Sequence, residues 1–344
     1  MKASGIRPQA SGLSHAIGWP EALPGPEARA LSLRAFVSHR AALLMFVLAA
    51  TVSGCQQPRA ATETEFVGPA PPVREALALP NRPGSIKFAA IGDAGRGDRA
   101  QYDVSAQMQA FRSVFKFDFV VMLGDNVYDG GTPRDYRLKF ELPYKPFLDE
   151  GIEFYATIGN HDDPNQPQYA PFHMRGQRYY TFVADGSLLS RLTDTDVRFF
   201  MIDTEALERT QLSWLDRELG RSRARWNIPV FHRPIYTSGR YRLPATILRS
   251  SLEPVLLRHD VRLALSGHEH FYQRTPPQSG VTYFISGGAG SLRRGDLRRS
   301  RLTADGYDAD YHFMLFEVTR DRIFYQAISR TGHSIDSGTI DKDR

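Results

Sequence analysis

The chain has 344 residues, of which 42% are hydrophobic and 11% aromatic, so it can build a sizeable core in one large domain or two small ones. The formal net charge is +5, but much of this excess lies in the first 54 residues. The remainder is close to neutral and gives little support for a nucleic-acid partner. The single cysteine excludes an intrachain disulfide framework.

Residues 1–54 are predicted to be a leader with a secretory signal. Arg40 precedes the apolar run 41–52, which ends in the small residues Ser53 and Gly54 before Cys55. A basic flank, a short apolar stretch and small residues before a cleavage site are typical of export signals. The end of this run resembles a bacterial lipobox. That resemblance implies lipidation of Cys55 and an extracytoplasmic, membrane-anchored protein on the periplasmic side or the cell surface; the alternative is a disordered leader with a chance apolar patch.

Residues 55–84 are rich in proline and alanine, which predicts a flexible tether, and residues 85–344 form the expected globular domain. In that domain, short apolar runs predict strands at 86–91, 118–123, 154–158, 179–183, 197–202, 228–231, 261–265, 281–285, 312–318 and 323–328. Helical spacing predicts helices at 102–115, 134–148 (interrupted by Pro143 and Pro146), 208–221 and 243–258. This order predicts an α/β fold of four layers, αββα, in which two mixed β-sheets pack face to face between helices.

Five short motifs follow predicted strands and carry metal-binding groups. They are Gly92-Asp93-Ala94-Gly95, Gly124-Asp125-Asn126-Val127-Tyr128, Gly159-Asn160-His161-Asp162, Val230-Phe231-His232-Arg233-Pro234 and Gly267-His268-Glu269-His270. In open α/β sheets, ligand sites gather outside the carboxyl ends of the strands. Two carboxylates, a phenol, an amide and four imidazoles suit two hard-to-borderline metal ions. A pair of adjacent ions is suited to in-line attack on a phosphoryl group.

Each motif also has an ordinary structural explanation. Asp93 fits a turn, Tyr128 a packed aromatic side chain, Asn160 a cap, and His232 a structural histidine. Five coincidences at five strand ends favour a site instead. Asp125 has two carboxylate oxygens, which would allow it to bridge two ions.

A further indication comes from the last motif. His268 and His270 are one residue apart after a buried strand, and at period two both imidazoles are expected on one side. His161 lies beside Asn160 on its loop, and neighbouring side chains diverge, so it is free to act as an acid or a phosphate donor rather than as a ligand.

In order and content the motifs resemble those of the calcineurin-like metallophosphoesterases, within them the purple (tartrate-resistant-type) acid phosphatases, here in a bacterial lipoprotein form. The similarity spans roughly residues 86–340, including stretches without ligands such as 211–215 and 271–274. It implies two metal ions, Fe(III) and a divalent ion (Fe, Zn or Mn). By this resemblance the ferric ion is held by Asp93, Asp125, Tyr128 and His270, and the divalent ion by Asn160, His232 and His268 with Asp125 bridging; His161 contacts the substrate phosphate.

Two departures from the family pattern stand out. Arg233 occupies a position where many relatives have a second histidine, so Arg233, Arg240 or Arg242 is a candidate for the missing phosphate contact. The large N-terminal β-domain of the plant enzymes has no room in this chain. The basic run 291–301 is either an aid to binding a large anion or a membrane surface, or a solvated loop.

These features predict an exported binuclear phosphatase that hydrolyses phosphomonoesters by attack of a metal-bound hydroxide, with His161 donating a proton to the leaving oxygen. The expected partners are a small phosphorylated substrate and, through Cys55, a membrane. The alternatives are a phosphodiesterase or nucleotidase on the same scaffold and a non-catalytic phosphate-binding surface protein.

Overall fold

The computed structural model describes residues 77–184 and 196–343. The expected leader, Cys55 and most of the expected tether lie outside the described residues. Across the described segments, no helix has both the length and the apolar content needed to cross a bilayer.

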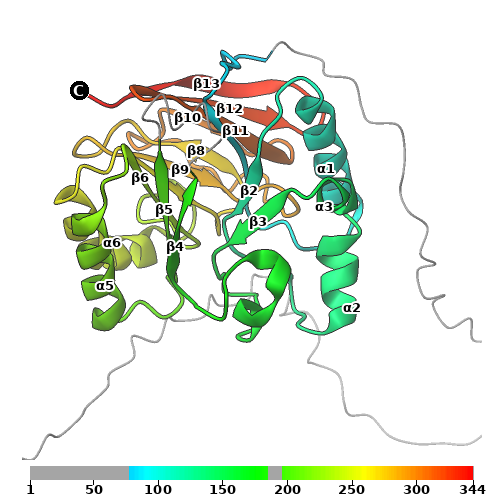
Figure 1. Ribbon diagram of the computed structural model, residues 1–344, viewed down its shortest axis with the longest axis horizontal. Helices are drawn as coiled ribbons and strands as arrows, with labels where there is room; N and C mark the ends of the chain where they lie inside the picture. Colours follow the sequence, from blue (N-terminus) through cyan, green and yellow to red (C-terminus); the bar gives the residue numbers. More distant parts are fainter. Residues whose placement is uncertain (1–76, 185–195, 344) are drawn as a thin grey trace, which may run out of the picture. The chain divides into compact units, whose positions relative to one another are not determined.

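The first of two sheets has six strands in the order β13-β12-β11-β1-β2-β3 (Figure 1). Its strands are β1 (Ile86–Ile91), β2 (Phe119–Met122), β3 (Glu153–Ala156), β11 (His312–Val318), β12 (Arg322–Ser329) and β13 (Ser334–Asp341). β1, β2 and β3 run parallel, whereas β11 lies antiparallel beside β1 and continues into an antiparallel meander. The sheet is therefore mixed.

The second sheet has seven strands in the order β10-β8-β9-β7-β6-β5-β4. They are β4 (Tyr180–Ala184), β5 (Val197–Ile202), β6 (Trp226–Phe231), β7 (Leu263–Ser266), β8 (Tyr272–Arg274), β9 (Thr282–Ser286) and β10 (Asp305–Tyr307). The central strands β5, β6, β7 and β9 are parallel, and the remaining strands pair antiparallel at the edges. This sheet is also mixed.

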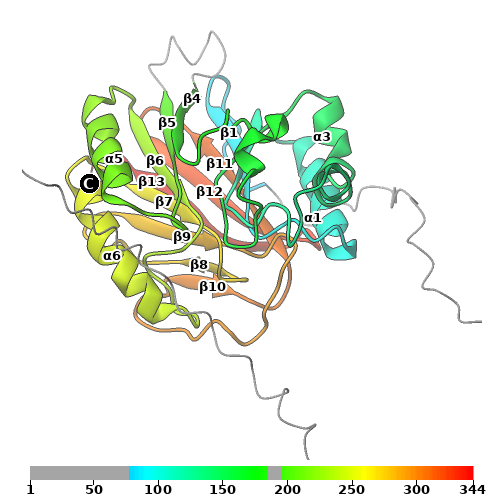
Figure 2. The same ribbon diagram turned by 90° about the horizontal axis from the view of Figure 1, so that it is seen from below.

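Helices cover the outer face of each sheet (Figures 1 and 2). Those beside the first sheet are α1 (Arg99–Arg112), α2 (Pro133–Tyr136) and α3 (Lys145–Asp149), and those beside the second are α5 (Arg209–Arg221) and α6 (Arg242–Leu257). α1 begins where the Asp98 carboxylate accepts a hydrogen bond from the backbone of Gln101, and it ends with Arg112 beside its free carbonyls. α5 buries Leu215 and Leu219 on one stripe.

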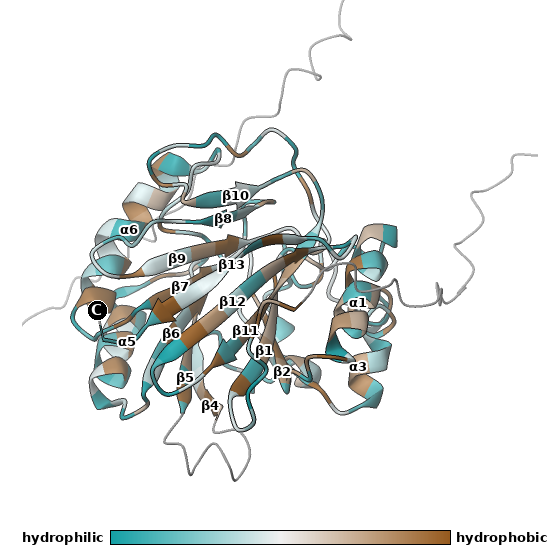
Figure 3. Ribbon diagram, turned by 90° about the horizontal axis from the view of Figure 1, so that it is seen from above, coloured by the Kyte–Doolittle hydropathy of each residue, from teal (hydrophilic) through white to brown (hydrophobic). Residues whose placement is uncertain are grey.

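Alternation along the strands produces the two cores. In β1, Ala89 and Ile91 belong to the core shared with the helices, whereas Phe88 and Ala90 belong to the core between the sheets. There Phe88 meets Phe199 of the opposite sheet edge to face, with ring centres 5.2 Å apart. The predominantly apolar central strands in Figure 3 match this double burial. The four-layer αββα prediction is confirmed.

Several predicted elements differ in detail. The helix expected at 134–148 is α2, a π-helical turn (Arg137–Glu141) and α3, because Pro143 and Pro146 interrupt the hydrogen bonding. The sequence analysis missed β8, β10 and β13. Two of these are three residues long, and β13 is a half-exposed edge strand rich in Ser, Asp and Gly, so none has a strong apolar pattern.

The end of the expected tether packs on the domain. Leu79 is buried in the core under the helices. The backbone N–H groups of Asn81 and Arg82 both donate to the buried carboxylate of Glu317. These contacts fix the chain before β1 begins.

The five motifs all follow the carboxyl ends of parallel strands. β1, β2 and β3 of the first sheet lead into the loops with Asp93, Asp125 and Asn160, and β6 and β7 of the second lead into those with His232 and His268. Because the sheets pack face to face with these ends on the same side, the loops meet there.

Candidate metal centre

Three side chains from three loops form a compact group of metal donors. The hydroxyl of Tyr128 lies 3.3 Å from Oδ1 of Asp93 and 3.1 Å from Nε2 of His270, and that nitrogen is 3.2 Å from the same carboxylate oxygen. All three residues are buried. Ligands with bonds of roughly 2.1 Å to one ion lie roughly 3 Å from each other. The three atoms stand at the separations that a shared cation requires.

A second group centres on Nε2 of His232. This nitrogen lies 3.1 Å from Oδ1 of Asn160, 3.2 Å from Nδ1 of His268 and 3.4 Å from Oδ1 of Asp125. The other ring nitrogen, Nδ1, donates to the carbonyl of Leu123 at 2.9 Å. That hydrogen bond fixes the tautomer and leaves the lone pair of Nε2 free for a metal.

Asp125 connects the two groups. One carboxylate oxygen each from Asp93 and Asp125 and a ring nitrogen of His270 all lie within 4.8 Å of one another. Oδ1 of Asp125 accepts the backbone N–H of His161 at 3.0 Å, whereas Oδ2 is buried and has no hydrogen-bond partner among the described residues. A buried carboxylate oxygen without a donor is costly unless a cation neutralises it, so the donors present fit metal ions.

The last motif divides its imidazoles between the groups. His268 offers Nδ1 to the group around His232, and His270 offers Nε2 to the group around Tyr128. The backbone N–H of His268 also donates to Oδ2 of Asp93 at 2.8 Å, which links the two sheets. The period-two spacing thus brings both rings to the same centre, where each ring joins a different donor group.

The charges in the metal-free chain suit this arrangement. Burial disfavours a charged His232, but the carboxylates of Asp125 and Asp93 outweigh it and raise the pKa. Burial likewise works against an ionised Asp125, yet His232 and further partners lower its pKa overall. Burial, His232 and Arg233 lower the pKa of His268 well below its usual value, so this ring is neutral and its lone pairs are available.

Tyr128 behaves differently. Burial, followed by the charge of Asp93, raises the pKa of its phenol far above 10. The neutral hydroxyl therefore donates to Asp93, and only a bound cation would ionise it. The guanidinium of Arg96 lies 3.6 Å from the ring centre of Tyr128, an electropositive contact that the sequence analysis did not identify.

His161 lies at the open side of the centre. Its side chain is 39% exposed, its ring centre is 4.8 Å from that of Tyr128, and Nδ1 is 3.2 Å from a carboxylate oxygen of Asp129. It is separate from both donor groups. This position fits a residue that meets a ligand rather than one that holds a metal.

The three arginines considered as phosphate contacts occupy different places. Arg233 forms a two-pronged ion pair with Glu205 and points Nη1 at Nε2 of His268, 3.1 Å away. Arg240 pairs with Asp296 at 2.8 Å. Arg242 is exposed at the start of α6. The guanidinium of Arg233 is thus largely occupied by its ion pair with Glu205.

Backbone strain is concentrated in the same loops. Asp93, Asp125 and His268 have φ values of 55°, 52° and 69°, a left-handed conformation that costs a side-chain-bearing residue roughly 1–2 kcal/mol. Gly159 lets its loop approach Asp125 so closely that a Cβ there would collide with that carboxylate. The surrounding fold thus holds the donors in place against a local preference.

Asp162, a residue outside the predicted donor set, joins two of the loops. Its carboxylate accepts the backbone N–H groups of Asn126, Val127 and Gly159 at 2.7, 2.9 and 2.8 Å. The side-chain amide of Asn126 adds a bond of 3.0 Å. A carboxylate next to His161 in a Gly-Asn-His-Asp sequence was the available signal, but its partners Asn126 and Val127 lie 36 and 35 residues upstream, and only the fold reveals them.

Comparisons with known proteins identify the family of the chain. The calcineurin-like phosphoesterase family matches residues 86–272, more than half of the chain. Tartrate-resistant acid phosphatase type 5 of Mus musculus is 25% identical over 256 residues, 65% of this chain and 78% of the relative. Purple acid phosphatase 7 of Arabidopsis thaliana is 26% identical over 294 residues, 75% of this chain and 87% of the relative.

One solved structure with the same fold is the purple acid phosphatase from seeds of yellow lupin, Lupinus luteus. It superposes with a TM-score of 0.61 at 16% identity, over 76% of this chain and 55% of that chain. The fold and the acid phosphatase relatives agree that the protein is a phosphoesterase hydrolase. By the family match, supported by the buried donor groups, the chain belongs to the calcineurin-like phosphoesterases.

Proposed function

We propose that the protein is an exported, binuclear metal-dependent phosphatase that hydrolyses phosphomonoesters. The observation that carries the proposal is the position of Asp125, whose carboxylate lies between two donor groups and has one oxygen without a partner among the described residues. A single ion would be bound by only one of the two donor groups and would leave the other group without a cation. The acid phosphatase relatives support monoesters as the substrate class.

The donor sets divide as follows. Asp93, Tyr128 and His270 would hold one ion, Asn160, His232 and His268 would hold the other, and Asp125 would contribute to both sites. When bound, the two ions supply positive charge that attracts phosphate oxygens and lowers the pKa of a water molecule. A phenolate is a hard donor, so the first site favours Fe(III), with Fe, Zn or Mn as the divalent partner.

His161 acts on the substrate from the open side. Its Nδ1 is held by the carboxylate of Asp129 at 3.2 Å, which leaves Nε2 to face an incoming phosphate ester. From there it contacts a phosphate oxygen and donates a proton to the leaving oxygen, so that the alcohol departs neutral. Its ring packs at a tilt of 36° against that of Tyr128, and this contact limits its orientation.

Export and anchoring rest on the sequence alone. The apolar run 41–52 followed by Ser53-Gly54-Cys55 supports cleavage before Cys55 and lipidation of its thiol. The protein would then work outside the cytoplasm, attached to a membrane. Mass spectrometry of the mature N-terminus tests this directly, because an intact Met1 contradicts processing.

The activity is tested with p-nitrophenyl phosphate and bis-p-nitrophenyl phosphate, each with and without a chelator. We expect faster hydrolysis of the monoester, loss of activity with the chelator, and recovery when metal is restored. A preference for the diester supports the phosphodiesterase or nucleotidase alternative. Phosphate binding without hydrolysis of either compound supports the non-catalytic alternative.

A further inference from the structure

A cavity of about 620 Å³ lies beside the first turns of α6, and three arginines line it: Arg242, Arg249 and Arg301. Its remaining polar side chains include Thr246 and Gln278, which are neutral. No carboxylate is part of the wall among the described residues. Three positive charges around one hollow make a local field that attracts anions.

Two separate segments supply these charges. Arg242, Thr246 and Arg249 are spaced by four and three residues on α6 and therefore share one face of the helix. Arg301 comes from the basic run before β10, which approaches this face from the other side. α6 lies on the same side of the domain as β8 and β10 in Figure 2.

The loop with Arg301 is held in place by hydrogen bonds. The hydroxyl of Ser238 lies 2.9 Å from that of Ser300 and 2.8 Å from that of Thr303. The side-chain amide of Gln273 donates to the carbonyl of Leu302 at 2.9 Å. Arg301 is therefore presented to the cavity from an anchored turn, which reduces the entropy cost of binding a ligand.

The guanidinium groups are available to an anion. Among the described residues, Arg242 and Arg301 take part in no ion pair. Arg249 lies over the ring of Tyr236, 4.5 Å from its centre, and the nearby Glu253 accepts the hydroxyl of that tyrosine at 2.6 Å. The two carboxylates that contact wall residues, Glu253 and Glu269, accept the hydroxyls of Tyr236 and Thr237 and form no ion pair with the three arginines among the described residues.

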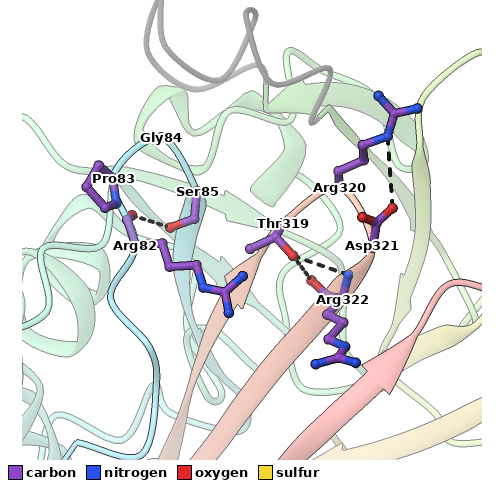
Figure 4. Close-up of a pocket in the computed structure, with 8 residues that line it drawn as sticks. All are labelled: Arg82, Pro83, Gly84, Ser85, Thr319, Arg320, Asp321 and Arg322. Atoms are coloured by element: carbon purple, nitrogen blue, oxygen red, sulfur yellow. Dashed lines mark hydrogen bonds and ion pairs between the residues drawn. The ribbon is translucent and has the colours of Figure 1, made fainter.

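A second hollow, of about 430 Å³, shows the opposite situation (Figure 4). Arg320 and Arg322 line it, but Asp321 is part of the wall and lies 3.9 Å from Arg320, and Arg322 pairs with Asp341 at 2.9 Å. This hollow also adjoins Ser85, before β1, whereas the metal donors follow the other end of that strand. Two of its three arginines are thus paired with carboxylates, the third being Arg82, and the hollow is remote from the centre.

The arginine cavity adjoins the metal centre. Thr237 in its wall donates to the carboxylate of Glu269 at 2.8 Å, and Glu269 stands between the donors His268 and His270. Tyr241, which precedes Arg242, has its ring centre 4.3 Å from that of His268. These two contacts connect the residues around the cavity to the loop that carries His268 and His270.

We propose that the arginine cavity is a second phosphate-binding site. Planar guanidinium groups match phosphate oxygens, and here three of them line one hollow. The phosphate is either free inorganic phosphate or the second phosphate of a substrate whose first lies at the metal centre. The site itself is independent of the proposed phosphatase activity, whereas its use by a substrate rests on that function.

Equilibrium dialysis of the full, metal-loaded chain against radiolabelled inorganic phosphate tests the site. We expect two phosphates per chain for the wild type and one for the Arg242→Gln/Arg301→Gln double variant, whose cavity affinity falls about tenfold or more. Arg294→Gln/Arg298→Gln is the matched control: it removes two charges from exposed positions of the loop that carries Arg301 and should keep two. Equal numbers for wild type and double variant overturn the proposal. A fall from one to none supports it while showing that the metal centre takes no phosphate.

A kinetic comparison identifies the source of the phosphate. With a monophosphorylated and a diphosphorylated alkanediol as substrates, a site for the second phosphate predicts that the double variant loses kcat/KM about tenfold for the diphosphate alone. A site for free phosphate predicts no difference between the two substrates, together with the change in dialysis. Both results support the cavity as a phosphate site.

Discussion

Replacing Asp162 by alanine should loosen the loops that hold the metal donors. The substitution leaves three buried backbone N–H groups, those of Asn126, Val127 and Gly159, without their acceptor. At roughly 1 kcal/mol for each stranded donor, the free energy of unfolding should fall by roughly 3 kcal/mol. For a domain of this size that corresponds to a decrease in Tm of roughly 6–12 °C.

The measurement is thermal unfolding followed by circular dichroism in the presence of a chelator, with metal content determined separately. Burial and the charge of Asp125 raise the pKa of Asp162 to about 7. At pH 5, therefore, its carboxyl is mostly protonated, and the comparison reports hydrogen bonds rather than repulsion. Asp163→Ala is the control, since that neighbouring carboxylate accepts the backbone N–H of Asn165, in its own loop. A loss below 1 kcal/mol for Asp162→Ala, or equal losses in both variants, would refute the reasoning.

Three more predictions concern the centre and its surroundings. Asp125→Asn should lose both metals and the activity, because the bridging charge is gone. His161→Ala should keep the metals and lose turnover by roughly 10²–10⁴-fold. Elemental analysis and kinetics distinguish the two variants, and equal metal loss in both contradicts the assignment. Iron-loaded wild type should be purple or pink from charge transfer between the phenolate and Fe(III), and Tyr128→Phe should abolish that visible absorption band; a colourless, fully active wild type without iron argues against the iron site. His312 is fully buried, and burial lowers its pKa to about 4. As the pH falls, the imidazole is therefore protonated in the unfolded chain before it is protonated in the folded one. The free energy of unfolding should fall by roughly 3 kcal/mol between a pH of about 6.5 and about 4. In urea unfolding across that range His312→Gln should show a shallower loss, and identical slopes would remove His312 from the acid response.

The fold was largely predictable because its central strands are short and mostly apolar runs, several of which lead into Gly or His. Burial on both faces dictates such runs, and β1 and β5 match the expected bounds. β13 was missed because an edge strand with one face in solvent needs few apolar residues. The interruption between α2 and α3 was visible as Pro143 and Pro146, although the π-helical turn was not.

For the candidate site, sequence reasoning found donors but not their connections. Chemical type and position after a strand were enough to single out Asp93 and His270. Which ring nitrogen of His268 faces His232 depends on loop dihedral angles, and no local pattern encodes them. The ion pair between Arg233 and Glu205 joins residues 28 positions apart in separate segments, so the sequence alone could not predict it.

The donors also come from opposite sheets, and this has a consequence for how the protein matures. Asp93 precedes His270 by 177 positions, and β1 gains its antiparallel neighbour β11 only when residues 312–318 are present. A growing polypeptide therefore offers carboxylates long before it offers imidazoles, and cannot retain a cation pair while it is still being made. On the proposed binuclear function, metal binding would be a late event that joins the loops of the two finished sheets, and the metals acquired would be those of the compartment in which the completed chain folds.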